Sequence, residues 1–150
     1  MNIRTAQKKD IDFLVDFNQA MALETEGKLL DGETLRSGVE AVFADSKKGF
    51  YVVAEMGEAI IGGLMITYEW SDWRNSWFWW IQSVYILPEH RGKGIYRMLY
   101  DYVKQKADTE KNICGFRLYV EKENENAQKV YEKLGMEASH YLMYEASTKR

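Results

Sequence analysis

An eleven-residue run, WFWWIQSVYIL at positions 77–87, is largely apolar at both odd and even positions. A strand with one solvated face would alternate between apolar and polar residues, so this run predicts a strand buried in the middle of a sheet and covered on each side. Pro-Glu-His-Arg-Gly-Lys-Gly follows at 88–94, and then a segment with apolar residues at helical spacing. The succession of buried strand, glycine turn and helix indicates an α/β domain.

Shorter patterns on both sides of the run predict the remaining elements. We expect further strands at 2–5, 50–54, 59–67, 116–120 and 140–145, and helices at 10–27, 33–44, from 95 onward and at 124–134. The order β-α-α-β-β-β-α-β-α-β predicts a central mixed sheet. Since the 150 residues contain no repeat or linker, we expect one domain over 1–150.

Charge and cysteine content exclude several classes of protein. Lys plus Arg number 20 against 23 Asp plus Glu, a net charge of −3 that argues against a general nucleic-acid binder. No apolar run approaches the roughly 18 residues of a membrane span, and the N-terminus does not resemble a signal peptide. One cysteine, Cys114, excludes an internal disulfide, which predicts a cytoplasmic protein. His90 and His140 show no metal-ligand spacing, so no metal is expected.

The glycine turn, Arg91-Gly92-Lys93-Gly94-Ile95, lies where an open sheet usually binds a ligand. Glycines allow close approach of the backbone, and the N-terminus of the next helix supplies unpaired N–H groups for a phosphate. Neither the Walker spacing nor the dinucleotide fingerprint occurs here. By itself the turn fits equally well with a plain connection between strand and helix.

A second motif decides between these two interpretations. Residues 124–136 read NENAQKVYEKLGM, and residues 84–95 read VYILPEHRGKGI. The two segments resemble the core motifs of the GNAT-type N-acetyltransferase superfamily, [QR]-x-x-G-x-[GA] after V-x-P and N-x-x-A-x-x-x-Y-x-x-x-G-[FM]. Tyr96 departs from the usual Gly or Ala, so its side chain must point away from the phosphates or crowd them.

The resemblance implies a three-layer α/β fold with about four helices. Its mixed, mostly antiparallel sheet would have six or seven strands and would splay between the Trp77–Leu87 and Phe116–Val120 strands. It also implies acetyl-CoA as co-substrate, with the pantetheine arm pairing with main-chain groups of Val84 and Ile86, and with Asn124 contacting the cofactor. The pyrophosphate would bind the main-chain amides of six consecutive residues: Arg91, Gly92, Lys93, Gly94, Ile95 and Tyr96.

The implied reaction is acetyl transfer to a primary amine by direct attack in a ternary complex. Tyr131, the tyrosine of the second motif, would be the general acid that protonates the CoA thiolate. A main-chain N–H at a bulge near Tyr85 could stabilise the oxyanion. Gln82 and Ser83 stand where relatives often carry a carboxylate base, and neither can accept a proton at neutral pH, so we expect an ordered water chain instead.

The acceptor is expected to be a positively charged amine, either a small molecule or a peptide. Acidic residues Glu24, Glu26 and Asp72 could border it together with Gln82, and Trp73 could hold a cation against its indole face. Trp79 and Trp80 are expected in the core, whereas the other tryptophans also fit core or dimer contacts. A non-catalytic acyl-CoA sensor is the alternative function. A homodimer is also expected if the strand at 140–145 is an unprotected edge.

Overall fold

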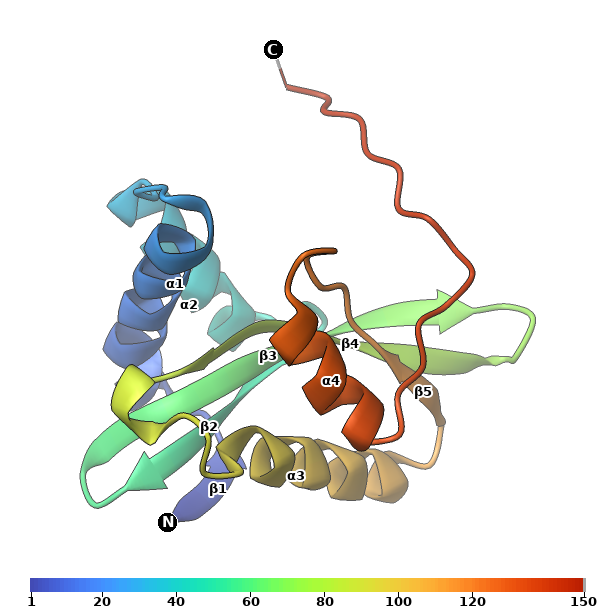
Figure 1. Ribbon diagram of the computed structural model, residues 1–150, viewed down its shortest axis with the longest axis horizontal. Coiled ribbons are helices and arrows are strands. Elements are labelled where there is room, and N and C mark those ends of the chain that lie inside the picture. The colour runs from blue at the N-terminus through green and yellow to red at the C-terminus, as the bar shows by residue number, and fades with distance from the viewer. Residues whose placement is uncertain (150) are drawn as a thin grey trace. The chain divides into compact units, whose positions relative to one another are not determined.

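The computed structural model describes residues 1–149 and divides into two compact units (Figure 1). The first unit, Met1–Tyr119, contains five strands: β1 (Asn2–Thr5), β2 (Phe50–Met56), β3 (Ala59–Ser71), β4 (Ser76–Ile86) and β5 (Ile113–Arg117). Its three α-helices are α1 (Ile11–Glu26), α2 (Gly32–Ala44) and α3 (Ile95–Glu110). The second unit begins at Val120 and contains α4 (Glu125–Lys133).

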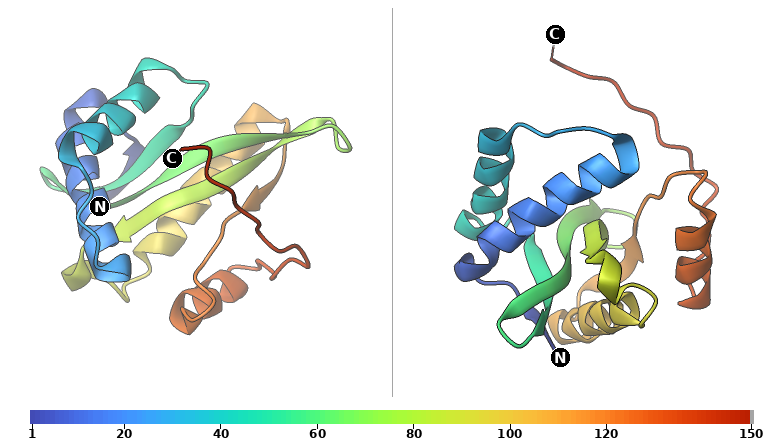
Figure 2. Two further views of the ribbon diagram at one scale, coloured as in Figure 1. Left: turned by 90° about the horizontal axis from the view of Figure 1, so that it is seen from above. Right: turned by 60° about the vertical axis from the view of Figure 1, so that its left-hand side comes forward.

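The five strands form one mixed sheet in the order β1-β2-β3-β4-β5. Neighbouring strands are antiparallel except β4 and β5, which are parallel because α3 connects them as a crossover. Figure 2 shows α1 and α2 on one face of this sheet and α3 on the other. The mixed, mostly antiparallel α/β sheet expected from the sequence is therefore confirmed, but within residues 1–149 it has five strands instead of the expected six or seven.

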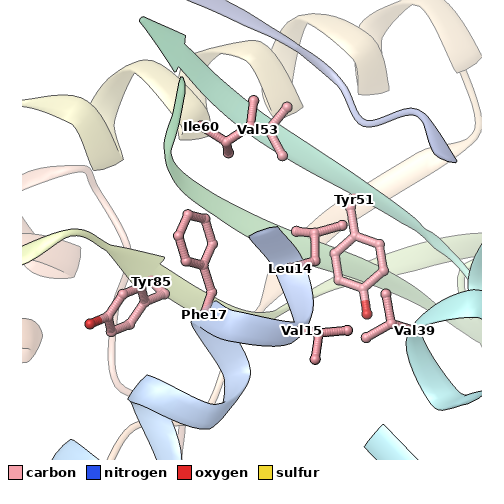
Figure 3. Close-up of a cluster of buried hydrophobic side chains, with 8 residues drawn as sticks. All are labelled: Leu14, Val15, Phe17, Val39, Tyr51, Val53, Ile60 and Tyr85. Atoms are coloured by element: carbon pink, nitrogen blue, oxygen red, sulfur yellow. The ribbon is translucent and has the colours of Figure 1, made fainter. Parts of the chain in front are cut away.

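Apolar side chains from both helical layers bury the sheet. On the α1–α2 face, side chains from α1, α2 and the strands form one cluster (Figure 3): Leu14, Val15, Phe17, Val39, Tyr51, Val53, Ile60 and Tyr85. On the other face, Leu99 and Val103 of α3 are fully buried. The apolar positions of α1 and α3 recur every three or four residues, so each helix presents one continuous stripe to the sheet.

The prediction of a buried central strand is confirmed by β4. It lies between β3 and β5, and Phe78, Trp79, Ile81 and Tyr85 are buried along it. Side chains that alternate in direction reach both faces of the sheet, which explains why both parities of the run are apolar.

Two expected elements differ from the structure. The strand expected at 116–120 is β5, which runs from Ile113 to Arg117. The strand expected at 140–145 is wrong: within residues 1–149 the sheet has five strands, and Tyr141, Leu142 and Tyr144 are exposed. An alternating pattern makes a segment suitable for a sheet, but a strand also needs a hydrogen-bonding partner, and this segment has none in the sheet.

Candidate functional site

The glycine turn after β4 adopts a backbone conformation that favours glycine. Gly92 and Gly94 have φ angles of 76° and 79°, in the left-handed region, and a Cβ atom built on either would meet nothing within 4 Å. Gly94 is the N-cap of α3, and as a glycine it has no side chain that could cap the N–H groups of the first turn. Those groups carry partial positive charge, so the turn presents an open surface that favours an anion.

Tyr96 does not crowd this surface. Its side chain is buried, and its ring stacks on that of Tyr100 one turn later in α3, with centroids 6.3 Å apart. A bulky residue is therefore accommodated at this position because it packs into the core below the helix.

The sheet splays on the side of β4 that faces β5. Pairing between the two strands ends at Trp80 and Arg117, whereas β4 continues to Ile86. On its other side, β4 stays paired with β3 as far as Ile86 opposite Gly62. The final residues of β4 therefore have a strand neighbour on one side only, as expected for a sheet that opens between these two strands.

Main-chain groups of β4 point into this opening. Leu87 donates its N–H to Ile61 O at 2.9 Å, which makes the Ile86–Gly62 pair a non-hydrogen-bonded one. The N–H and C=O of Ile86 therefore point away from β3. Val84 has no residue opposite it in the β3–β4 register. The Tyr85 main chain instead faces Gly63 within the ladder.

A bulge precedes this edge. The β3–β4 register shifts between Gly63 and Met65, and Ser83 has a φ of 52°, which is rare for a residue other than glycine. The expected bulge near Tyr85 is confirmed. It re-aims the chain at the point where the opening begins, so a main-chain N–H can face a ligand there.

Three residues that are distant in sequence meet at the end of the opening. Glu24 is in the last turn of α1, Tyr85 is on β4, and Arg91 begins the glycine turn. The Tyr85 hydroxyl donates a short hydrogen bond to Glu24 Oε2, and Arg91 Nη2 donates to Glu24 Oε1 at 2.9 Å. Arg91 Nε also donates to Ile86 O at 2.8 Å, and its guanidinium lies over the Tyr85 ring, 5.2 Å from the centroid.

This contact reinforces the protonation state that each partner already has at neutral pH. The hydrogen bond from Tyr85 is the main cause that lowers the pKa of Glu24; burial opposes it, and Arg91 lowers the pKa further. Burial and the bond to Glu24 raise the pKa of Tyr85. Glu24 is therefore a carboxylate, and Tyr85 keeps its proton as a donor.

A second polar cluster lies farther along the same face of the sheet. Trp80 Nε1 donates to Glu69 Oε1 at 2.8 Å, and Arg117 Nη1 donates to the same oxygen at 2.9 Å. Sequence reasoning missed Glu69 and Arg117. The alternation of Thr67, Glu69 and Ser71 along β3 was the signal that could have found this polar face.

Gln82 has a partner within the same face. Its Nε2 donates to Thr67 Oγ1 at 2.6 Å, so the amide is held in place next to the bulge. The side chain borders the opening without being able to act as a base there.

The structure does not bring all the expected acceptor residues together. Glu26 is exposed and pairs with Lys28 at 3.3 Å. Asp72 and Trp73 lie in the β3–β4 turn, where Trp73 is 90% exposed. The strand β4 lies between that turn and the Glu24 cluster, and its length from Ser76 to Tyr85 is about 30 Å. Of the expected carboxylates, only Glu24 lies at the end of the opening.

In the second unit, the motif residues have clear local roles. Asn124 caps α4, because its side chain accepts a hydrogen bond from Ala127 N at 3.1 Å. The Asn and Ala of the N-x-x-A motif are therefore the N-cap and N3 positions of a helix. Tyr131 lies on α4, and burial raises the pKa of its hydroxyl.

Neither a membrane span nor a metal cluster was found in the part of the chain that the structure describes. No helix there is long and apolar enough to cross a bilayer, and no group of three or more His, Cys, Asp or Glu side chains could hold a metal ion.

The arrangement can hold an extended ligand with an anionic end. Main-chain groups of Val84 and Ile86 offer pairing partners along the opening, and the glycine turn offers an anion-favouring surface beyond Arg91. A flexible chain bearing amides and a diphosphate matches both features.

Comparison with known proteins identifies the family. The model of the acetyltransferase (GNAT) family matches residues 15–136. No curated protein matches the sequence. A crystal structure of "a possible acetyltransferase" from Clostridium difficile 630 is 48% identical, with a TM-score of 0.92, covering 99% of this chain and 98% of that one.

Two further structures share the fold. One, described as "a probable acetyltransferase", is 24% identical with a TM-score of 0.84, covering 100% of this chain and 99% of that one. The other, a "predicted acetyltransferase with acetyl-CoA" from Clostridium acetobutylicum, is 24% identical with a TM-score of 0.78, covering 97% and 95%. From its family match, its fold and its open β4 edge, the chain belongs to the GNAT family of acetyltransferases.

Proposed function

We propose that the protein transfers the acetyl group of acetyl-CoA to a primary amine by direct attack in a ternary complex. The observation that carries the proposal is the opening between β4 and β5, with Ile86 main-chain groups directed into it and the glycine turn at its end. Family membership supports acetyl transfer, and the opening supports an extended acyl-CoA as the donor.

The donor would be held mainly by the backbone. Val84 and Ile86 would pair with the amides of the pantetheine arm as an added strand does. The amides of residues 91–96 would bind the pyrophosphate, an arrangement supported by the left-handed glycines and the uncapped start of α3. Asn124, which caps α4, would contact the cofactor from the second unit.

The bulge on β4 would stabilise the charge that develops during attack. Because the main chain of Tyr85 faces Gly63 and Val84 has no partner in β3, we assign the oxyanion contact to the N–H of Val84. The proposed donor is therefore the N–H of Val84, next to the expected position at Tyr85.

Two proton transfers accompany the reaction. A lysine-like amine has a pKa of about 10.4 and must lose a proton before it attacks. Gln82, held by Thr67, would order the water that carries this proton away. Tyr131, a phenol and therefore protonated at neutral pH, would donate a proton to the departing thiolate.

The acceptor would be a cationic amine, either a small molecule or a peptide. Glu24 supports this because its carboxylate is negatively charged at neutral pH and lies at the end of the opening, where it contacts Tyr85 and Arg91. Nothing in the charge balance favours nucleic acid as a partner. We propose further that residues 1–150 work as one cytoplasmic catalytic domain, since the family match extends across both units. The expected dimer loses its basis, because residues 140–145 form no edge strand.

The test combines acetyl-CoA binding with thiol release against polyamines, aminoglycosides, amino acids and peptides. Thiol release above the water background with one class of amine supports the transferase and identifies its acceptor. Tight acetyl-CoA binding with no release for any amine would favour the acyl-CoA sensor. Absence of acetyl-CoA binding would contradict the donor assignment itself.

A further inference from the structure

A single guanidinium occupies groups that the proposed reaction needs. Arg91 Nε donates a hydrogen bond to Ile86 O at 2.8 Å, and Arg91 Nη2 donates one to Glu24 Oε1 at 2.9 Å. The Ile86 carbonyl points into the opening, where an amide of the pantetheine arm would use it. Glu24 is the one expected acceptor carboxylate that lies at this end of the opening.

The same guanidinium lies beside the surface proposed for the diphosphate. Arg91 immediately precedes Gly92, and Lys93 and Arg97 add exposed positive charge to the turn and the first turn of α3. Acetyl-CoA would therefore supply new partners for two of these groups. Its diphosphate would bind the guanidinium, and an amide N–H would bind the Ile86 carbonyl.

We propose that Arg91 exchanges partners when acetyl-CoA binds, leaving Ile86 and Glu24 for the diphosphate and thereby exposing Glu24 as the recognition site for an ammonium group of the acceptor. The inference rests on the proposed function and adds to it an acceptor class. The attacking nitrogen must be neutral, so the ammonium at Glu24 is a second, non-reacting one. The favoured acceptor is therefore a diamine or a longer polycation.

The relative strengths of the contacts favour the exchange. The side chains of Arg91 and Glu24 are 46% and 38% exposed, and such solvent-exposed ion pairs change an equilibrium constant only about 1.4- to fivefold. A guanidinium binds phosphate oxygens through a planar pair of N–H groups, and the diphosphate carries more charge than one carboxylate. The pair with Glu24 is thus weak enough to be displaced.

Tyr85 would keep Glu24 in place after Arg91 leaves. Its hydroxyl donates to Glu24 Oε2, the oxygen that Arg91 does not contact, and its ring packs against Phe17 with centroids 5.4 Å apart. Figure 3 shows these two rings side by side, with the hydroxyl directed outward from the cluster. The carboxylate therefore stays oriented while its second oxygen becomes available to an ammonium group.

The first test is the dissociation constant of CoA, measured by calorimetry for the wild type, E24Q, R91Q and the double variant. Removal of the competing charge should make E24Q bind CoA about 1.4- to fivefold more tightly, the range expected for an exposed ion pair. In the R91Q background, the same change should have no effect, because there is no guanidinium to release.

A matched exposed ion pair between α1 and α2 provides the control. Asp12 Oδ1 accepts from Arg36 Nη2 at 2.8 Å, with the two side chains 80% and 45% exposed. D12N and R36Q remove the same charges and should leave CoA affinity unchanged. Equal tightening by D12N and E24Q, or weaker or unchanged CoA binding by E24Q, would overturn the exchange.

The second test measures binding of 1,4-diaminobutane and of 1-aminobutane, each with and without saturating CoA. Saturating CoA should strengthen diamine binding by the same factor by which E24Q strengthens CoA binding. It should leave monoamine binding unchanged. By linkage the diamine must tighten CoA equally. R91Q should bind the diamine equally well with and without CoA.

The outcomes separate the inference from the proposed function. If the wild type binds CoA but shows no coupling to the diamine, the exchange is overturned and the donor assignment stands. If the wild type binds no CoA, both are overturned. The Nε–H NMR resonance of Arg91, identified by its loss in R91Q, gives an independent readout, because it must shift when CoA displaces Ile86 O.

Discussion

Replacement of Asp10 by Asn should strongly destabilise the fold. Asp10 is 2% exposed and receives Arg4 Nη1 at 2.8 Å, Arg4 Nη2 at 3.0 Å and Gln7 N–H at 2.7 Å. An amide keeps one acceptor oxygen but loses the charge that matches Arg4. Breaking a buried ion pair costs about 3–5 kcal/mol, and since Arg4 keeps Glu55 at 2.9 Å, we expect about 3 kcal/mol.

Urea unfolding and calorimetry measure this effect directly. A loss of about 3 kcal/mol corresponds to a fall in Tm of about 6–12 °C in a chain of this size. D12N, an exposed acid two residues later, should cost less than about 0.5 kcal/mol. A difference between D10N and D12N below about 1 kcal/mol would refute the reasoning.

The same pair predicts how stability depends on pH. Burial opposes ionisation of Asp10, but hydrogen bonds from Arg4 and Gln7 outweigh it, so the pKa of Asp10 is lowered. A lowered pKa adds stability that is fully present above the unfolded value of about 3.9 and is lost as the pH falls through the folded value. The difference between the wild type and D10N should therefore be constant above about pH 5 and shrink below pH 4.

Four further substitutions test the site and the sheet. G94A and G57A should each lose about 1–2 kcal/mol of stability, because both glycines have a positive φ and open space around them. Only G94A should also weaken CoA binding, by about tenfold in calorimetry. Equal CoA affinity would exclude close backbone contact. Y131F should lower thiol release about 10²–10⁴-fold with CoA affinity unchanged, and equal turnover would remove Tyr131 from the mechanism. G115A should lower Tm, since its Cβ would lie 2.9 Å from the Phe78 ring; an unchanged Tm would show that the ring can move.

Local patterns predicted the parts of the fold that depend on neighbouring residues. Both parities of the run at 77–87 are apolar, and β4 lies at that place with covered faces. Gly92 and Gly94 marked the turn before α3, and their positive φ angles explain why glycine stands there. Asn124 marked the start of α4, because an N-cap acts within its own helix.

Pairing between distant segments could not be predicted in the same way. The alternating residues at 140–145 met the requirements of a strand but have no partner in the sheet. The strand after α3 was expected three residues too late, because the pattern of apolar residues does not say which of them pair with β4. Asp72 and Glu24 share a charge, but the length of β4 keeps them apart, and the type of residue does not encode that distance.

The sequence by itself determined the class of fold, the buried strand, the glycine turn and the resemblance that the family match confirmed. These depend on residue periodicity and on short motifs, both of which are local. Only the tertiary structure decided that the sheet opens beyond Trp80 and that Arg91 meets Glu24, 67 residues earlier in the chain. Such contacts depend on strand register and on the end of a helix reaching the end of a strand, and no local pattern encodes either distance.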